Sequence, residues 1–144
     1  MKVYCEHGGL TSALRELQRA RRIILIVFPY DTDSKARQIS RTAFPSAAQY
    51  RDLNLTYSEL NRTYGDLKGS EMLSKIIKII GLNNRRDALH VDSAYKSECR
   101  VFVTRDSDIL KHSERLEQLL HIRVINPDRD HETFLSLLAE SEAV

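Results

Sequence analysis

The first 30 residues constrain the fold most, because they carry a strand–helix–strand pattern. Residues 2–5 form a short apolar run, and residues 23–28 form a β-branched apolar run that Pro29 closes. Between the two runs, apolar side chains recur at helical spacing, at Leu10, Ala13, Leu14, Leu17 and Ala20. Such a unit pairs its two strands in parallel through a right-handed connection. The second run is apolar at every position, which predicts a central strand buried on both faces.

The rest of the chain continues this alternation. Further strands are expected at residues 101–104 and 122–125. Helices are expected at residues 34–39, 56–60, 71–80 (capped by Ser70 and ended by Gly81), 86–97 and 109–120 (broken near Ser113), with a last helix that Asp130 caps and that bears Phe134, Leu135 and Leu138. The sequence therefore predicts an α/β fold, a three-layer α/β/α sandwich around a mostly parallel sheet of about four to five strands.

Length and composition limit the class of protein. The 144 residues suit a single domain, residues 1–144, with an acidic tail from about residue 139. No apolar run approaches the roughly 18 residues that a membrane helix needs. The two cysteines, Cys5 and Cys99, lie in or beside apolar runs and predict buried thiols in a reducing compartment. We therefore expect a cytoplasmic protein without a membrane partner.

Acidic side chains follow each of the first three strand-like runs. They are Glu6 after the first run (with His7), Asp31 and Asp33 after the second, and Asp106 and Asp108 after the third. Asp87 begins the helix that leads into the third strand. Because parallel strands bring their carboxyl ends to one edge, these acids are expected to converge there and to repel one another unless a cation is bound. Oxygen-seeking Mg²⁺ or Mn²⁺ fits such a set, and such ions can drive phosphodiester hydrolysis.

Each acid also has a plainer interpretation. Asp33 and Asp106 stand where helix-capping residues stand, and any one of the acids alone is more often a cap or turn residue than a metal ligand. His7 suits either a turn or a contact to phosphate or metal. His90 lies on the same helix side as Asp87 and is expected to be a hydrogen-bonded core histidine. The argument for a metal site is the joint position of the acids.

The net charge of +2 is small, but the basic residues are segregated. Residues 34–51 contain no acid and carry Lys35, Arg37, Arg41 and Arg51. A second basic group consists of Arg15, Arg19, Arg21 and Arg22. Segregated basic surface is typical of a polyanion partner, although an ordinary solvated surface explains it equally well. The chain has no Cys-x-x-Cys, Gly-x-Gly-x-x-Gly or Gly-x-Ser-x-Gly motif, which argues against a zinc knuckle, a dinucleotide cradle and a nucleophile elbow.

Two segments in order carry a family resemblance. Residues 86–94 read Arg-Asp-Ala-Leu-His-Val-Asp-Ser-Ala, and residues 101–110 read Val-Phe-Val-Thr-Arg-Asp-Ser-Asp-Ile-Leu. An Asp-Ala helix followed by an apolar strand ending in Thr-x-Asp closely resembles the carboxy-terminal half of PIN-domain proteins. Residues 2–6 resemble the first strand of that family. The resemblance implies a Mg²⁺- or Mn²⁺-dependent ribonuclease, and many small bacterial members are toxins of toxin–antitoxin pairs.

The resemblance also implies roles for individual residues. Asp87 and Asp106 match two acids of the family, and Asp108 supports Asp106. Glu6 stands where the family has an Asp, and Asp31 and Asp33 are the acids nearest to the family's Glu after the second strand. The implied catalytic residues are Glu6, Asp33, Asp87 and Asp106, the implied metal ligands are Glu6, Asp31, Asp33, Asp87, Asp106 and Asp108, and the implied substrate contacts are His7, Lys35, Arg37 and Arg41. In that assignment the carboxylates hold a metal that activates water, and one of them accepts the proton.

The two departures in the amino-terminal half leave two interpretations. The first is an active endoribonuclease with a rearranged ligand set, with RNA as the substrate by resemblance and DNA not distinguished from it. The second is a PIN-like module that binds RNA or a protein without catalysis. The resemblance also implies two partners, an antitoxin protein and a second copy of this chain.

Overall fold

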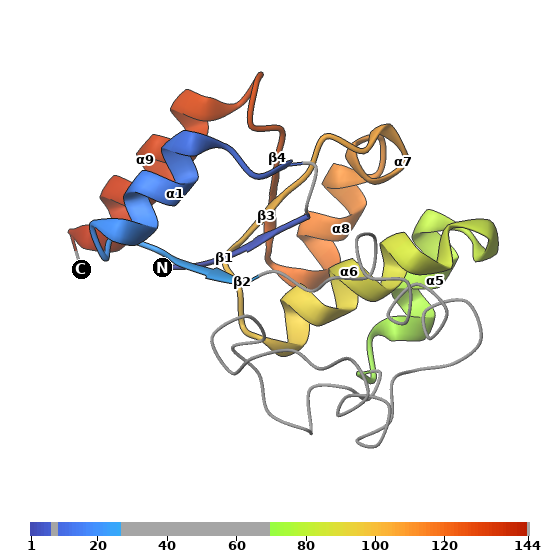
Figure 1. Ribbon diagram of the computed structural model, residues 1–144. Coiled ribbons are helices and arrows are strands. Elements are labelled where there is room, and N and C mark those ends of the chain that lie inside the picture. Colours follow the sequence, from blue (N-terminus) through green and yellow to red (C-terminus); the bar gives the residue numbers. More distant parts are fainter. Residues whose placement is uncertain (7–8, 27–69, 144) are drawn as a thin grey trace, which may run out of the picture.

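The sheet of the protein is parallel throughout. The computed structural model describes residues 1–6, 9–26 and 70–143 (Figure 1). In these residues, strands β1 (Lys2–Cys5), β2 (Ile24–Ile26), β3 (Val101–Val103) and β4 (Arg123–Ile125) form one four-stranded sheet in the order β2-β1-β3-β4. All three strand pairings are parallel. The expected parallel α/β architecture is therefore confirmed.

The opening strand–helix–strand unit forms as predicted. Helix α1 (Ser12–Arg19) connects β1 to β2, and the Thr11 hydroxyl caps it by accepting a 3.2 Å hydrogen bond from the amide of Leu14. The position of β2 differs from the prediction: in the described sheet it is an edge strand, and Ile24 is 48% exposed. A β-branched run specifies extended backbone and some burial, but it does not specify how many neighbours the strand will have.

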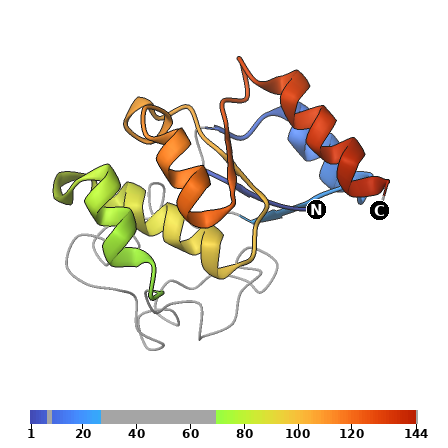
Figure 2. The same cartoon turned by 180° about the vertical axis from the view of Figure 1, so that it is seen from behind.

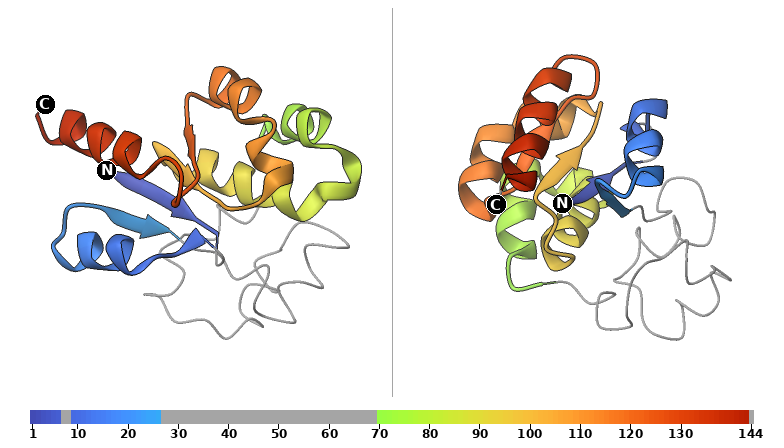
Figure 3. Two further views of the ribbon diagram at one scale, coloured as in Figure 1. Left: turned by 90° about the horizontal axis from the view of Figure 1, so that it is seen from above. Right: turned by 90° about the vertical axis from the view of Figure 1, so that its left-hand side faces the viewer.

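Two hydrophobic cores lie on the two faces of the sheet, because successive side chains of a strand point to opposite faces. Tyr4, Phe102 and Val124 face a core built with α5 (Leu73–Ile80), α6 (Arg85–Lys96), α7 (Ser107–Leu110) and α8 (Ser113–Leu120). Val3, Val101 and Ile125 face a second core built with α1 and α9 (His131–Glu142). The strands lie between these two helix groups, as Figures 1, 2 and 3 show from different sides. The predicted three-layer sandwich is confirmed.

The helices on the α6 face begin and end close to the predicted positions. Helix α5 starts at Leu73, and Met72, not Ser70 as predicted, occupies its N-cap position; the Ser70 hydroxyl instead accepts the amide of Met72 in the turn before the helix. Gly81, with φ of 108°, ends α5, and the short 3-10 helix η3 (Leu82–Asn84) leads into α6. The buried carboxylate of Asp92 in α6 accepts hydrogen bonds from both the amide and the hydroxyl of Ser70. The predicted break near Ser113 separates α7 from α8.

Helix α9 corrects two expectations. Asp130 occupies its N-cap position, but the carboxylate accepts the Asn126 amide at 3.0 Å and not an amide of the helix. Leu135 is 41% exposed, because the buried face of α9 is formed by Phe134, Leu137 and Leu138. Helix α9 continues to Glu142, so Glu140 and Glu142 of the acidic stretch lie within the helix.

The end of α9 is tied to the turn before β2. Glu142 accepts hydrogen bonds of 2.7 and 3.0 Å from the guanidinium of Arg22.

None of the helices in the described ranges is both long enough and apolar enough to cross a membrane. The helices expected at residues 34–39 and 56–60 lie outside the described residues.

Candidate metal centre

Glu6 directly follows β1 and is hydrogen-bonded to the end of β3. Its amide donates a 3.2 Å hydrogen bond to the carbonyl oxygen of Val103. Its carboxylate oxygen Oε1 accepts a 2.9 Å hydrogen bond from the hydroxyl of Thr104. The side chain is only 9% exposed, so the backbone and the hydroxyl together fix where this carboxylate lies.

Asp106 is positioned by the same threonine. Its amide donates a 2.9 Å hydrogen bond to the Thr104 hydroxyl oxygen, and its own Oδ1 accepts the amide of Asp108 at 2.8 Å. Asp106 is thus the N-cap of α7, as its sequence position predicted. A cap uses one carboxylate oxygen, so capping is compatible with a second role for the carboxylate.

Asp87 completes the group from a third element. It lies in the first turn of α6 and is half-buried. One ligand atom each of Glu6, Asp87 and Asp106 lies within 4.8 Å of the other two. The carboxyl ends of β1 and β3 and the start of α6 therefore bring together three of the acids that the sequence singled out.

The chemistry of this donor set fits a hard divalent cation. Its ligand atoms are carboxylate oxygens, without the nitrogen or sulfur that zinc and copper sites favour. Three carboxylates at such separations repel one another, and this repulsion is relieved when a cation binds between them. Mg²⁺ and Mn²⁺ are bound by few carboxylates plus water and substrate oxygens, which a partly buried three-acid group can provide.

Asp108, which was expected among the ligands, is not brought into this group. Its amide supports Asp106, but its carboxylate pairs with Lys111 at 3.3 Å. The two acids are only two positions apart, and α7 begins between them, which turns the second carboxylate away. Six further candidates lie outside the described residues, namely His7, Asp31, Asp33, Lys35, Arg37 and Arg41.

Thr104 is the residue of this centre to which sequence reasoning assigned no role. It is fully buried, and its hydroxyl contacts both Glu6 and the amide of Asp106. The signal was the Thr-x-Asp motif, in which the hydroxyl can accept the amide two residues on. Its second partner, Glu6, is 98 positions away in the sequence and is found only from the fold.

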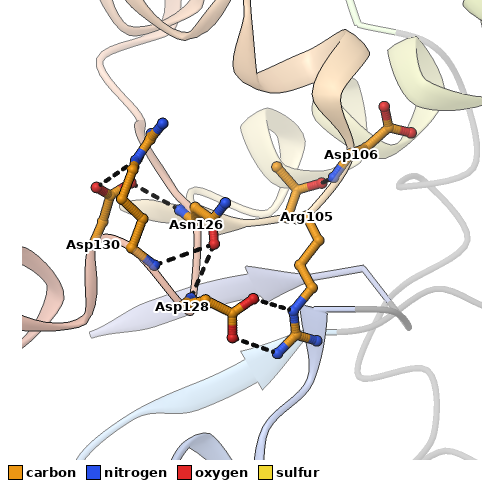
Figure 4. A network of polar contacts seen from close by, with 7 residues as sticks. Arg105, Asp106, Asn126, Asp128 and Asp130 are labelled. Atoms are coloured by element: carbon orange, nitrogen blue, oxygen red, sulfur yellow. Dashed lines mark hydrogen bonds and ion pairs between the residues drawn. The ribbon is translucent and has the colours of Figure 1, made fainter.

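A network of polar contacts fixes the residue between Thr104 and Asp106. Arg105 donates hydrogen bonds of 2.8 and 3.0 Å to the carboxylate of Asp128, in the loop after β4. The Asn126 side chain accepts the Asp128 amide at 2.9 Å, and the Arg129 guanidinium pairs with Asp130 (Figure 4). In Figure 4 the Arg105 side chain points to Asp128, and the Asp106 carboxylate points the opposite way. The Arg105 guanidinium is thus held by Asp128 in the loop after β4.

The neighbouring cysteine does not contribute a thiolate. The pKa of the Cys5 thiol is raised from its ordinary 9.0 to about 12, first by burial and then by the negative charge of Glu6. The positive charges of Arg105 and Arg15 act in the opposite direction. Since metal ligation and nucleophilic attack both need the thiolate, Cys5 is a buried apolar residue at neutral pH. Cys99 is likewise a buried thiol, as the sequence predicted.

His90 is a core histidine, as predicted. It is 1% exposed, and a 2.7 Å hydrogen bond joins its Nδ1 to the hydroxyl of Tyr4. Among the described residues, the group of potential metal ligands does not include it.

Comparison of the chain with models of known families, with curated proteins and with solved structures gives no significant match. The resemblance to PIN domains therefore depends on the motif residues alone. The chemistry of the site has to be argued from the three carboxylates and the residues that hold them.

Proposed function

We propose that this chain is a divalent-metal-dependent phosphodiester hydrolase, an endoribonuclease of the PIN type. One observation carries the proposal: Glu6, Asp87 and Asp106 come from three separate elements and present ligand atoms within 4.8 Å of one another. The carboxyl edge of a parallel sheet is where α/β proteins place their ligand sites. All three residues are among those that the PIN resemblance implies as ligands.

The chain's own residues would hold the ion in a fixed geometry. Thr104 restrains one oxygen of Glu6, and the cap bond to the Asp108 amide restrains one oxygen of Asp106. An ionised carboxylate has two oxygens and about four lone-pair sites, so a carboxylate that accepts one hydrogen bond can also serve as a ligand or accept a proton from water. A bound Mg²⁺ or Mn²⁺ supplies Lewis-acid stabilisation of a phosphodiester and a water of lowered pKa.

Positive charge near the centre supports a phosphodiester as the substrate. The charge of Arg15 acts to lower the pKa of the Cys5 thiol, next to Glu6, and so does that of Arg105, whose guanidinium is already paired with Asp128. Both side chains belong to exposed residues.

The PIN resemblance adds RNA as the substrate, and it extends the proposal to a toxin with an antitoxin partner. Lys35, Arg37, Arg41 and His7 remain proposed substrate contacts.

The test is cleavage of mixed single-stranded RNA by the purified chain, with and without Mn²⁺. Asp106→Asn is the informative variant, because Asn caps a helix as well as Asp does but removes the charge. Glu140→Gln removes a charge from an exposed position late in α9 and is the matched control. We expect Mn²⁺-dependent cleavage by the wild type and by Glu140→Gln, and a loss of at least a hundredfold in Asp106→Asn, on the order of the losses seen when catalytic geometry is disturbed.

Two outcomes would contradict the proposal. Cleavage that Asp106→Asn retains would assign the activity to a different site or to a contaminant. Binding of RNA without cleavage by any of the three proteins would favour the alternative, a PIN-like module that binds without catalysis.

A further inference from the structure

A layer of three aromatic side chains lies in the core between β1, β3 and α6. Tyr4 stacks on Phe102 with ring centroids 5.2 Å apart and planes 5° apart. His90 meets Tyr4 edge-on, with centroids 5.8 Å apart. A 2.7 Å hydrogen bond joins the Tyr4 hydroxyl to His90 Nδ1. All three side chains are at most 1% exposed, so this is a dry contact with one directional polar bond in it.

Each member of this aromatic layer lies two or three positions from a member of the candidate metal centre. Tyr4 of β1 stands two residues before Glu6, which directly follows that strand, and Phe102 of β3 stands two residues before Thr104, which directly follows its strand. Side chains two apart on a strand point to the same face. On α6, Asp87 lies three residues before His90, which places the two on one helix side. The aromatic layer and the metal centre are therefore neighbours along each of the three chain segments that form them.

The Tyr4–His90 bond is a polar tie between β1 and α6, within a cluster of apolar side chains that packs the helix on the sheet. Apolar packing is non-directional, so it resists separation of a helix and a sheet better than it resists small rotations. A rotation of α6 by roughly 20° would move a side chain at the helix surface by about 2 Å, given a helix radius of about 5–6 Å. Metal sites tolerate ligand displacements of only about 0.5 Å.

We propose that Tyr4 is a positioning residue of the metal centre. Its hydroxyl, through His90, holds α6 in the rotation that keeps Asp87 within ligand distance of Glu6 and Asp106. This inference rests on the proposed function, because it requires the three carboxylates to bind a metal ion. It assigns a role in metal affinity to a hydroxyl that bonds His90 and is not a member of the three-carboxylate group.

The decisive variant is Tyr4→Phe, which removes one hydroxyl and keeps the ring stack. Its matched control is Tyr95→Phe, which removes a hydroxyl from α6 itself, where Tyr95 donates an exposed hydrogen bond of 2.9 Å to Glu71. The measurement is Mn²⁺ affinity of the folded proteins by calorimetric titration. We expect Tyr4→Phe to bind Mn²⁺ about tenfold more weakly, in the range found for residues that orient metal ligands. Tyr95→Phe is expected to bind as the wild type does.

A merely structural role would lower the melting temperature of Tyr4→Phe but leave the Mn²⁺ affinity of the folded protein unchanged, and that result overturns the inference. If the wild type binds no Mn²⁺, the metal centre itself fails, and the inference fails with it. The two failures are distinguishable because the first leaves wild-type binding intact.

A second pair of variants keeps the inference testable if Tyr4→Phe does not fold. His90→Leu removes the hydrogen bond from the other side, whereas His90→Asn keeps a polar atom close to the position of Nδ1. Weak Mn²⁺ binding by His90→Leu with near-normal binding by His90→Asn supports the positioning role. Equal affinity of the two variants contradicts it.

Discussion

The hydroxyl of Thr104 donates a 2.9 Å hydrogen bond to Oε1 of Glu6, across 98 residues of sequence. The oxygen of the Thr104 hydroxyl in turn accepts a 2.9 Å hydrogen bond from the amide of Asp106. One buried hydroxyl therefore restrains two of the three carboxylates of the candidate metal centre. A glutamate has one more rotatable bond than an aspartate, and the bond from Thr104 removes part of that freedom.

Replacing Thr104 separates its packing from its hydrogen bonds. Thr104→Val keeps the shape but leaves the Asp106 amide and the Glu6 carboxylate without this partner, and we expect a loss of about 1–3 kcal/mol in the free energy of unfolding. Thr104→Ser keeps the hydroxyl and should bind Mn²⁺ within a few-fold of the wild type, whereas Thr104→Val should bind at least about tenfold more weakly. Urea unfolding and Mn²⁺ titration check both. Equal Mn²⁺ affinity of the two variants would show that the hydroxyl does not orient the ligands.

Removing one charge from the centre should have opposite effects in the absence and presence of metal. Asp106→Asn keeps the cap acceptor for the Asp108 amide but removes one of three carboxylate charges within 4.8 Å. Like charges about 4 Å apart repel by about 1 kcal/mol in water and by more when partly buried. We therefore expect the metal-free variant to unfold at the same or a higher temperature than the wild type.

With Mn²⁺ the order should reverse. The wild type gains stability from binding by mass action, and Asp106→Asn does not. Thermal unfolding at increasing Mn²⁺ concentrations checks the prediction, with Glu140→Gln as the charge-matched control that keeps the full shift. A metal-free Asp106→Asn that is clearly less stable than the wild type would mean that the carboxylate is structural.

The alternation of strands and helices could be predicted, because period-2 and period-3.6 patterns are local properties of the sequence. The edge position of β2 could not, since it depends on which strands pair, and the chain places β1 between β2 and β3. The exposure of Leu135, by contrast, follows from local periodicity: Phe134, Leu137 and Leu138 are spaced i, i+3 and i+4 and form the buried face of α9, which leaves Leu135 outside it.

The candidate metal centre could also be predicted only in part. Parallel strands bring their carboxyl ends together, so the approach of Glu6 and Asp106 follows from topology, and the helix before β3 adds Asp87. The separation of Asp106 from Asp108 depends on where α7 begins, within a single turn of chain. The pairing of Thr104 with Glu6 depends on the register of β1 on β3, in which Tyr4 lies opposite Phe102. Neither detail is encoded in residue spacing.

The buried Cys5 thiol predicts how stability changes at alkaline pH. Its pKa is about 12 in the folded protein against an ordinary value of 9.0, so between these values the folded state keeps a proton that the unfolded chain has lost. Its contribution to stability is therefore complete below pH 9.0 and is lost as the pH rises toward about 12. Each pH unit in this window lowers the free energy of unfolding by about 1.4 kcal/mol.

Other groups titrate in the same range, so the prediction is a difference between two proteins. Cys5→Ala lacks the thiol and should lose stability less steeply than the wild type between about pH 9 and pH 11. Urea unfolding at several pH values gives the two slopes. The absolute stability of the variant is not the readout, because the smaller side chain also leaves a cavity. Parallel slopes would mean that the thiol titrates normally in the folded protein.

Gly9 is expected to tolerate no side chain, because of its approach to β3. Its amide donates to the Glu6 carbonyl at 2.9 Å, and a Cβ at this position would lie 3.1 Å from the Val103 carbonyl oxygen. That oxygen accepts the Glu6 amide, so it cannot retreat without moving the end of β3. Overpacking costs about 1–3 kcal/mol, which outweighs the roughly 0.4–1 kcal/mol that Gly→Ala gains by restricting the unfolded chain.

Gly9→Ala should therefore destabilise the fold and also weaken Mn²⁺ binding, because the displaced carbonyl helps to fix Glu6. The control has to be less stable than the wild type without a change at the metal centre. Ala139→Gly meets this requirement, because it lowers the free energy of unfolding by about 1 kcal/mol at an exposed position late in α9. Urea unfolding gives the two stabilities, and calorimetric titration gives the two Mn²⁺ affinities. If both variants bind Mn²⁺ as the wild type does, the close approach of Gly9 to Val103 serves only the packing of the sheet. If only Gly9→Ala loses affinity, the same carbonyl that closes the β1–β3 ladder also sets the position of the Glu6 carboxylate.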